Sequence, residues 1–127
     1  MIINGQEEIY KIGDKIYHCG THITMDLIGG KWKCTILWYL RHRETRFSEL
    51  KNFMPDITEK MLSIQLKSLE EDFFISRKVI GNKAPLKVFY SLTEEGKSLL
   101  SIIKLITSWG DKYGKKNGEL IDKESLL

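Results

Sequence analysis

The clearest pattern of apolar and polar residues runs from Asp56 to Phe73. Its apolar positions are Leu62, Leu66, Leu69 and Phe73. Steps of four, three and four residues place these positions in one stripe along a helix. Thr58 follows the turn formers Pro55 and Asp56, so we expect it to cap the helix N-terminus. The pattern predicts a helix that packs by one side and leaves the other open.

The open side of this helix carries small, polar and cationic residues. They are Thr58, Lys60, Ser63, Ile64 and Lys67. Such a face suits the major groove of DNA, which admits a helix and presents a distinct pattern for each base pair. An ordinary amphipathic surface helix has the same pattern, so the flanking segments must decide between the two interpretations.

The preceding segment predicts a shorter helix from Arg46 to Met54, because its apolar residues recur at helical spacing. Two short helices joined by a tight turn form the helix-turn-helix arrangement, although many all-helical domains contain such a corner. The polar residues of this shorter helix that we expect near DNA phosphates are Arg46, Ser48 and Lys51.

The period changes after Phe73. Ile75–Ile80 and Leu86–Leu92 are rich in β-formers, and Gly81–Pro85 between them has turn chemistry, which predicts a hairpin. The cations between positions 77 and 87 are Arg77, Lys78, Lys83 and Lys87, and no acid lies among them. A solvated surface hairpin more commonly mixes the signs, so the charge favours a phosphate-binding wing.

A last helix is expected from Thr93, with acids in its first turn. Its apolar residues cover more than half of the helix circumference, which is more than packing on one domain requires. A central helix in a compact monomer is the alternative to burial against a second subunit. The residues that we expect in a dimer interface are Leu99, Ile102, Ile103, Ile106 and Trp109.

The N-terminal region is harder to interpret. Met1 to Cys19 has several apolar residues, and Gly5 and Gly13 argue against one long element. A loose tail and an arm packed on a partner subunit are equally compatible with it. Short helices are then predicted over Thr21–Ile28, capped by Thr21, and over Lys31–Leu40.

The length, charge and composition of the chain limit its possible class, partners and location. A chain of 127 residues favours one domain, and a net charge of +3 permits a nucleic-acid partner without demanding one. No apolar run approaches the roughly 20 residues of a membrane span, and no signal-like segment begins the chain, so we expect a cytoplasmic, nucleoid-associated protein. Cys19 and Cys34 are too few for a disulfide framework, and the spacing of Cys and His predicts no metal site or cofactor.

Several motifs together point to one family. They are Cys19, Asp26-Leu27-Ile28-Gly29-Gly30-Lys31-Trp32, Arg46-Phe47-Ser48-Glu49-Leu50, Ile57-Thr58-Glu59-Lys60-Met61-Leu62, Leu66, Leu69, Glu70 and Tyr90-Ser91-Leu92-Thr93-Glu94-Glu95-Gly96. In these motifs the chain resembles the HxlR-type, MarR-related bacterial transcriptional regulators over roughly Cys19 to Trp109. Gly20 stands where the family usually has proline, and Phe74 where a smaller residue is usual.

The resemblance implies a mainly α (α+β) winged helix-turn-helix with a two-stranded wing and with N- and C-terminal dimerisation helices. It implies a homodimer that binds double-stranded DNA at a near-palindromic operator, with Met1 to Ile28 and the last helix forming the interface. The expected organisation is an arm at 1–18, the winged domain at 19–111 and a polar tail at 112–127.

The resemblance also makes Cys19 a candidate redox sensor, since some members sense oxidants through an N-terminal cysteine. A half-buried, inert thiol is the alternative. A pocket for a small aromatic effector, lined by Trp38 or Trp109, is a further possibility that no pattern selects.

Two other classes stay open. An enzyme would use Cys19 as nucleophile and His18 or His22 as base, but the chain has no phosphate loop and no evident acid pair, so we expect a non-enzyme. A dimeric protein-interaction module would have kept the winged fold without DNA binding. The acids of the central helix keep this alternative open, and the uninterrupted cations of the hairpin count against it.

Overall fold

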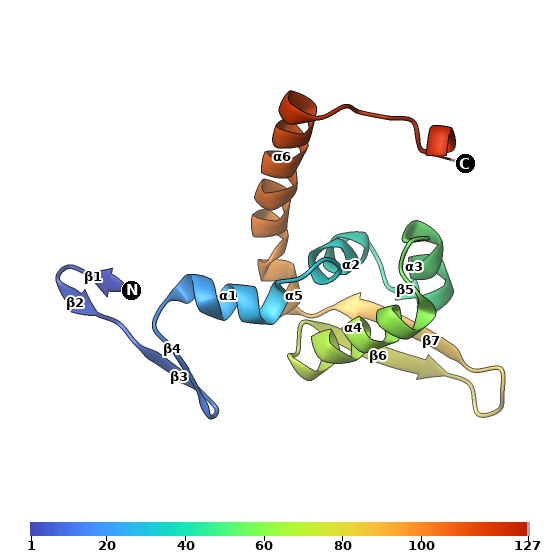
Figure 1. Ribbon diagram of the computed structural model, residues 1–127. Helices are drawn as coiled ribbons and strands as arrows, with labels where there is room; N and C mark the ends of the chain where they lie inside the picture. The colour runs from blue at the N-terminus through green and yellow to red at the C-terminus, as the bar shows by residue number, and fades with distance from the viewer. Residues whose placement is uncertain (127) are drawn as a thin grey trace.

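The computed structural model describes residues 1–126. Three helices and a three-stranded antiparallel sheet form its body (Figure 1). The helices are α2 (Lys33–Tyr39), α3 (Phe47–Phe53) and α4 (Glu59–Glu71). The strands are β5 (Thr45–Arg46), β6 (Ile75–Ile80) and β7 (Lys87–Leu92), in the spatial order β5-β7-β6. The predicted winged helix-turn-helix, mainly α with a small sheet, is confirmed.

The core forms where α2, α3, α4 and the base of the sheet meet. The apolar stripe of α4 is buried as predicted at Leu62, Leu66 and Leu69, whose exposed fractions are at most 1%. Thr58 caps the helix as expected, because its Oγ1 accepts the backbone N–H of Met61 at 3.0 Å. Burying each of these leucines contributes about 1.5–3 kcal/mol, so one face of α4 is fixed firmly to the core.

Phe73 does not belong to the buried stripe, contrary to the prediction. The backbone N–H of Phe74 bonds to the Leu69 carbonyl and that of Phe73 to the Glu70 carbonyl, both at 3.0 Å, which is the Schellman pattern that ends helices. Phe73 therefore adopts a left-handed conformation, with φ of +62°, and its side chain is 78% exposed. Phe74, only 6% exposed, occupies the core position instead.

The last helix is broken at Leu99 into α5 (Glu94–Ser98) and α6 (Leu100–Asn117). Thr93 caps α5 as predicted, since its Oγ1 accepts the Gly96 N–H at 3.1 Å. α6 rises away from the body (Figure 1) and continues to Asn117, into the segment that we expected to be a polar tail from residue 112. The chain then crosses to the α3 side, where a 3-10 turn covers Lys123–Leu126.

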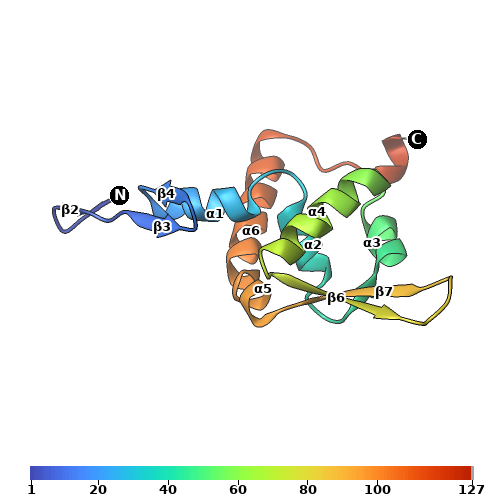
Figure 2. The ribbon, with the colours of Figure 1, turned by 90° about the horizontal axis from the view of Figure 1, so that it is seen from below.

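The N-terminal arm consists of two small hairpins that extend away from the body (Figures 1 and 2). One pairs β1 (Ile2–Ile3) with β2 (Gln6–Glu7), and the other pairs β3 (Tyr10–Ile12) with β4 (Lys15–Tyr17). The Asn4-Gly5 turn has positive φ at both residues, as tight hairpin turns require. Residues 1–18 are thus more regular than a loose tail.

Helix α1 (Gly20–Ile28) follows the arm, and Cys19 is its N-cap residue, not Thr21 as predicted. The second hairpin is fastened to α1 through the Asp26 carboxylate, which binds Lys15 Nζ at 3.0 Å and accepts the Tyr17 hydroxyl. These contacts lower the pKa of Asp26, with the Tyr17 bond as the largest cause.

Candidate nucleic-acid interface

Helix α4 presents a polar face to solvent on the side opposite its buried leucines. Lys60, Ser63 and Lys67 are exposed, and the Ile64 side chain is 48% exposed. Thr58, at the N-terminus of this face, is also exposed, although its hydroxyl oxygen already accepts the capping bond. The five residues that the sequence predicted as DNA contacts on α4 therefore lie together on one exposed side of the helix.

The pleat of the sheet divides the basic residues of the wing between two faces. Lys78 pairs with Phe89, and Lys87 pairs with Ile80, so these lysines lie on the face opposite the core. Arg77 pairs with the buried Tyr90 and lies on the other face. Lys83 is exposed in the turn between the strands. The sequence predicted the cationic wing correctly but did not assign its residues to faces.

Arg46 joins the wing cations through β5. It pairs with Phe89 across the sheet, so Arg46, Phe89 and Lys78 form one row over three strands. Thr45 beside it points to the core and is 1% exposed. Ser48, on the first turn of α3, is exposed as well. The row places Arg46 and Lys78 on the same face of the sheet, on either side of Phe89.

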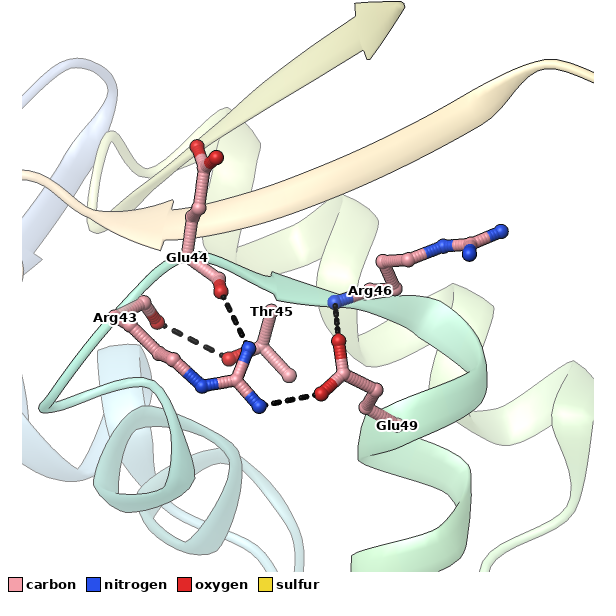
Figure 3. Close-up of polar contacts among 5 residues, drawn as sticks. All are labelled: Arg43, Glu44, Thr45, Arg46 and Glu49. Carbon is pink, nitrogen blue, oxygen red and sulfur yellow. Dashed lines mark hydrogen bonds and ion pairs between the residues drawn. The ribbon is translucent and has the colours of Figure 1, made fainter.

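The junction of β5 and α3 is held by the Glu49 carboxylate (Figure 3). Its Oε2 is paired with Arg43 Nη2 at 2.5 Å, and its Oε1 accepts the backbone N–H of Arg46 at 3.3 Å. The Arg43 contact, followed by the Arg46 N–H, lowers the pKa of the Glu49 carboxyl. Sequence reasoning missed Arg43, because its partner is a carboxylate on the following helix.

Acidic residues accompany the cations of α4. Glu59 and Glu71 are exposed, and Asp72 is exposed at the C-terminal end. These residues, together with Glu70, outnumber Lys60 and Lys67. Attraction to a polyanion therefore has to come mainly from the wing and from Arg46.

The surface of α6 carries an apolar strip. Its residues are Ile102, Leu105, Ile106, Trp109 and Tyr113, which are between 42% and 72% exposed. The Trp109 and Tyr113 rings are stacked, with centroids 5.2 Å apart. Ile103 is only 1% exposed and lies in the core of its own chain, so it is not part of the strip, contrary to our expectation for a dimer interface. Leu99 is half-buried against the same core.

The two cysteines differ in environment. Cys19 is partly exposed, and its pKa is lowered chiefly by the Thr21 side chain, with the backbone N–H groups of Thr21 and His22 adding to the effect. Burial raises the pKa of Cys34. His18 Nδ1 lies 2.7 Å from Glu7 Oε1, so the His18 ring is engaged with the arm.

Two hollows lie beside α2. One of about 340 Å³ between α2 and α6 is lined by Trp38, with Thr107 and Lys112 among its other walls. A larger one of about 530 Å³ lies between Trp32, Tyr39, the Met54-Pro55 turn and the C-terminal residues Lys123 and Leu126. Trp38 thus borders a hollow, whereas Trp109 lies on the apolar strip of α6.

Residues 1–126 contain no cluster of three or more His, Cys, Asp or Glu side chains placed to hold a metal ion. Over the same residues, no helix combines the length and apolar character that crossing a membrane requires.

An open-faced helix after a tight turn, flanked by a basic hairpin, defines a DNA-binding protein of the winged helix-turn-helix class. A family model described as HxlR-like helix-turn-helix matches residues 27–118 of the chain. The chain belongs to this family, and it is a transcriptional regulator related to the MarR regulators.

Relatives and solved structures agree with this family assignment. The chain is 48% identical over 99 residues to an uncharacterized HTH-type transcriptional regulator, YtcD, of Bacillus subtilis strain 168, with 78% of each chain covered. The reduced form of the redox regulator HypR superposes with a TM-score of 0.69 at 38% identity, covering 74% of this chain and 92% of that one. The reduced form of YodB from B. subtilis gives 0.63 at 32% identity, covering 75% and 93%.

Proposed function

We propose that the protein acts as a homodimer that binds a near-palindromic operator sequence-specifically, with one α4 helix in each of two successive major grooves. The observation that carries this proposal is the division of α4 into a leucine face at most 1% exposed and an exposed face of Lys60, Ser63, Ile64 and Lys67. A helix fixed so firmly by one side presents the other in a defined orientation, as base readout requires.

Base readout and phosphate binding fall to different elements. Ser63 and Ile64 occupy the middle of the open face of α4, where base edges are reached. Lys78, Lys83, Lys87 and Arg77 of the wing, together with Arg46 and Ser48, supply contacts to phosphates or to the minor groove, with Thr58, Lys60 and Lys67 flanking the bases. Phosphate contacts carry most of the affinity and make it salt-dependent, whereas base contacts set the sequence preference.

The dimer is supported by the apolar strip on α6. Its side chains are exposed in one chain, although large contiguous apolar surfaces usually mark an interface. The arm, residues 1–18, adds exposed Ile2, Ile12 and Ile16. A second copy packed on this surface buries both sets, and it places the two α4 helices about 34–36 Å apart, one turn of DNA.

Cys19 is proposed as the site at which oxidants or electrophiles modulate DNA binding. A sensing thiol needs exposure and a lowered pKa, and Cys19 has both at the N-terminus of α1. The similarity to the redox regulator HypR supports this assignment. The position of Cys19, between the arm and α1, lets a modification act on the proposed dimer surface.

The deciding experiment selects binding sequences from a random duplex library with the full-length protein, under reducing and then oxidising conditions. Under reducing conditions, enrichment of an inverted repeat is the expected result. Oxidation should abolish this enrichment for the wild-type protein but not for Cys19→Ser. Absence of enrichment under both conditions refutes operator binding and favours the protein-interaction module.

Two variants then test the assignment of base readout to α4 and of phosphate binding to the wing. Lys87→Ala should weaken binding to operator and random duplexes alike and reduce the salt dependence, because it removes a phosphate contact. Ser63→Ala should change which sequences are bound while leaving the salt slope unaltered. Equal losses on both kinds of DNA for both variants would contradict the assignment.

A further inference from the structure

We propose that Arg43 is a positioning residue for DNA binding: it occupies the Glu49 carboxylate and so keeps the Arg46 guanidinium free for a DNA phosphate. This inference rests on the proposed function, in which Arg46 is a phosphate contact. Arg43 itself makes no contact with DNA in this arrangement.

Both oxygens of the Glu49 carboxylate are in use (Figure 3). Oε2 binds Arg43 Nη2, and Oε1 accepts the backbone N–H of Arg46 at 3.3 Å. The Arg43 guanidinium also donates from Nη1 to the Glu44 carbonyl at 3.2 Å. Arg43 is thus held in place by the Glu44 carbonyl and by the Glu49 carboxylate. It binds the carboxylate from the side opposite to the Arg46 side chain (Figure 3).

The Arg46 side chain extends away from Glu49 in the same view (Figure 3). Its guanidinium makes no contact with the other four residues drawn there, and none of the ion pairs found within residues 1–126 includes it. β5 fixes this direction, because Thr45 is buried and strand alternation turns Arg46 to the opposite face, in the row with Phe89. Arg46 is therefore a free, oriented cation at the edge of the wing.

Without Arg43, the Glu49 carboxylate could pair with the Arg46 guanidinium instead. Arg46 is the N-cap residue of α3 and Glu49 is its N3 residue, and the Glu49 carboxylate already reaches back to the Arg46 backbone N–H, so it lies close to the base of the Arg46 side chain. Guanidinium and carboxylate form strong, often bidentate pairs, so an unoccupied Glu49 would draw Arg46 inward and neutralise it. The Arg43 ion pair removes that competition.

Stability does not explain the pair. The side chains of Arg43 and Glu49 are 61% and 32% exposed, and ion pairs this exposed stabilise proteins little. Their mutual contact nevertheless moves the pKa of the carboxyl down and that of the guanidinium up, as a well-formed pair does. A well-formed pair of small stabilising value is consistent with a role in orienting a neighbour.

The test measures how binding to a fixed mixed-sequence duplex depends on salt concentration. Affinity falls as salt rises, and each phosphate contact contributes about 0.9 to the magnitude of the slope of log affinity against log salt. Arg46→Ala should reduce this magnitude by about 0.9 per bound chain, and Arg43→Ala should reduce it by a similar amount. In the double variant Arg43→Ala/Glu49→Gln the slope should return to the wild-type value, since the neutral amide side chain introduced by the second substitution cannot neutralise Arg46.

A matched control is Lys97→Ala, which removes the cation of another exposed ion pair, that of Lys97 with Glu94 at 3.2 Å. Its slope should equal the wild-type value. If Arg43→Ala keeps the wild-type slope, or if the double variant stays as low as Arg43→Ala, the positioning role is overturned, the second result indicating a direct phosphate contact by Arg43. If Arg46→Ala leaves the slope unchanged, the failure lies instead in the proposed phosphate contact.

Discussion

Gly96 lies where the first turn of α5 approaches the turn between α4 and β6, and the prediction is that no larger residue fits there. A Cβ atom at this position would lie 2.1 Å from the Phe74 carbonyl oxygen and 3.1 Å from its carbon. Both of these neighbours are backbone atoms, which no rotamer change can move. The same carbonyl accepts the Thr93 N–H at 3.1 Å, and Thr93 Oγ1 donates to the Phe73 carbonyl at 2.6 Å.

The expected cost of Gly96→Ala follows from these contacts. Relieving the clash requires a backbone shift of about 1 Å, and such overpacking costs about 1–3 kcal/mol. The shift also weakens the hydrogen bonds around Thr93, at about 1 kcal/mol. Alanine regains about 1 kcal/mol of helix propensity. The net loss in free energy of unfolding is therefore about 2 kcal/mol.

Urea denaturation followed by circular dichroism measures this loss. Gly114→Ala is the control, because a Cβ there meets nothing within 4 Å and the residue lies inside α6. It should be as stable as the wild type or more stable, by up to about 1 kcal/mol. All variants have to be compared at one protein concentration, since the stability of the proposed dimer would depend on that concentration. A Gly96→Ala protein as stable as Gly114→Ala would refute the steric argument.

Further predictions concern Phe73 and the cysteines. Phe73→Gly should be more stable than Phe73→Ala by about 1 kcal/mol in urea denaturation, because only glycine adopts the left-handed conformation without strain; equal stabilities would contradict this. Cys19 should be alkylated by iodoacetamide faster than Cys34 and at a lower pH than an ordinary thiol, since its pKa is lowered and that of Cys34 is raised. Peptide mass spectrometry across a pH series measures both rates, and faster labelling of Cys34 would reverse the assignment.

Sequence reasoning was most successful where the deciding signals are local. The leucine spacing of α4, the cap at Thr58 and the basic hairpin are each contained within a few neighbouring residues. Each was found at the predicted place, because caps, turns and periodicity act over one or two helical turns. The winged class could be predicted from their order along the chain.

The misassigned residues depend on longer-range geometry. Phe73 has the spacing of the stripe, but the chain must leave α4 and enter β6, and the Schellman turn that achieves this places Phe74 in the core. Ile103 fits an interface helix by sequence, yet its neighbours bury it in its own chain. The hairpin at Asn4-Gly5 did have a local signal, a dipeptide typical of tight hairpin turns, and it was overlooked.

The distribution of charge leads to a prediction about how the proposed operator is distinguished from random DNA. The acids of α4 oppose approach of that helix to DNA, whereas the wing and Arg46 attract the phosphates regardless of sequence. In the proposed binding mode we therefore expect encounter to begin at the wing, and α4 to enter the groove only where base contacts offset the repulsion. Removing acids from the exposed end of α4, for example Glu71, should accordingly strengthen binding to random DNA more than binding to the operator, and so reduce discrimination between them.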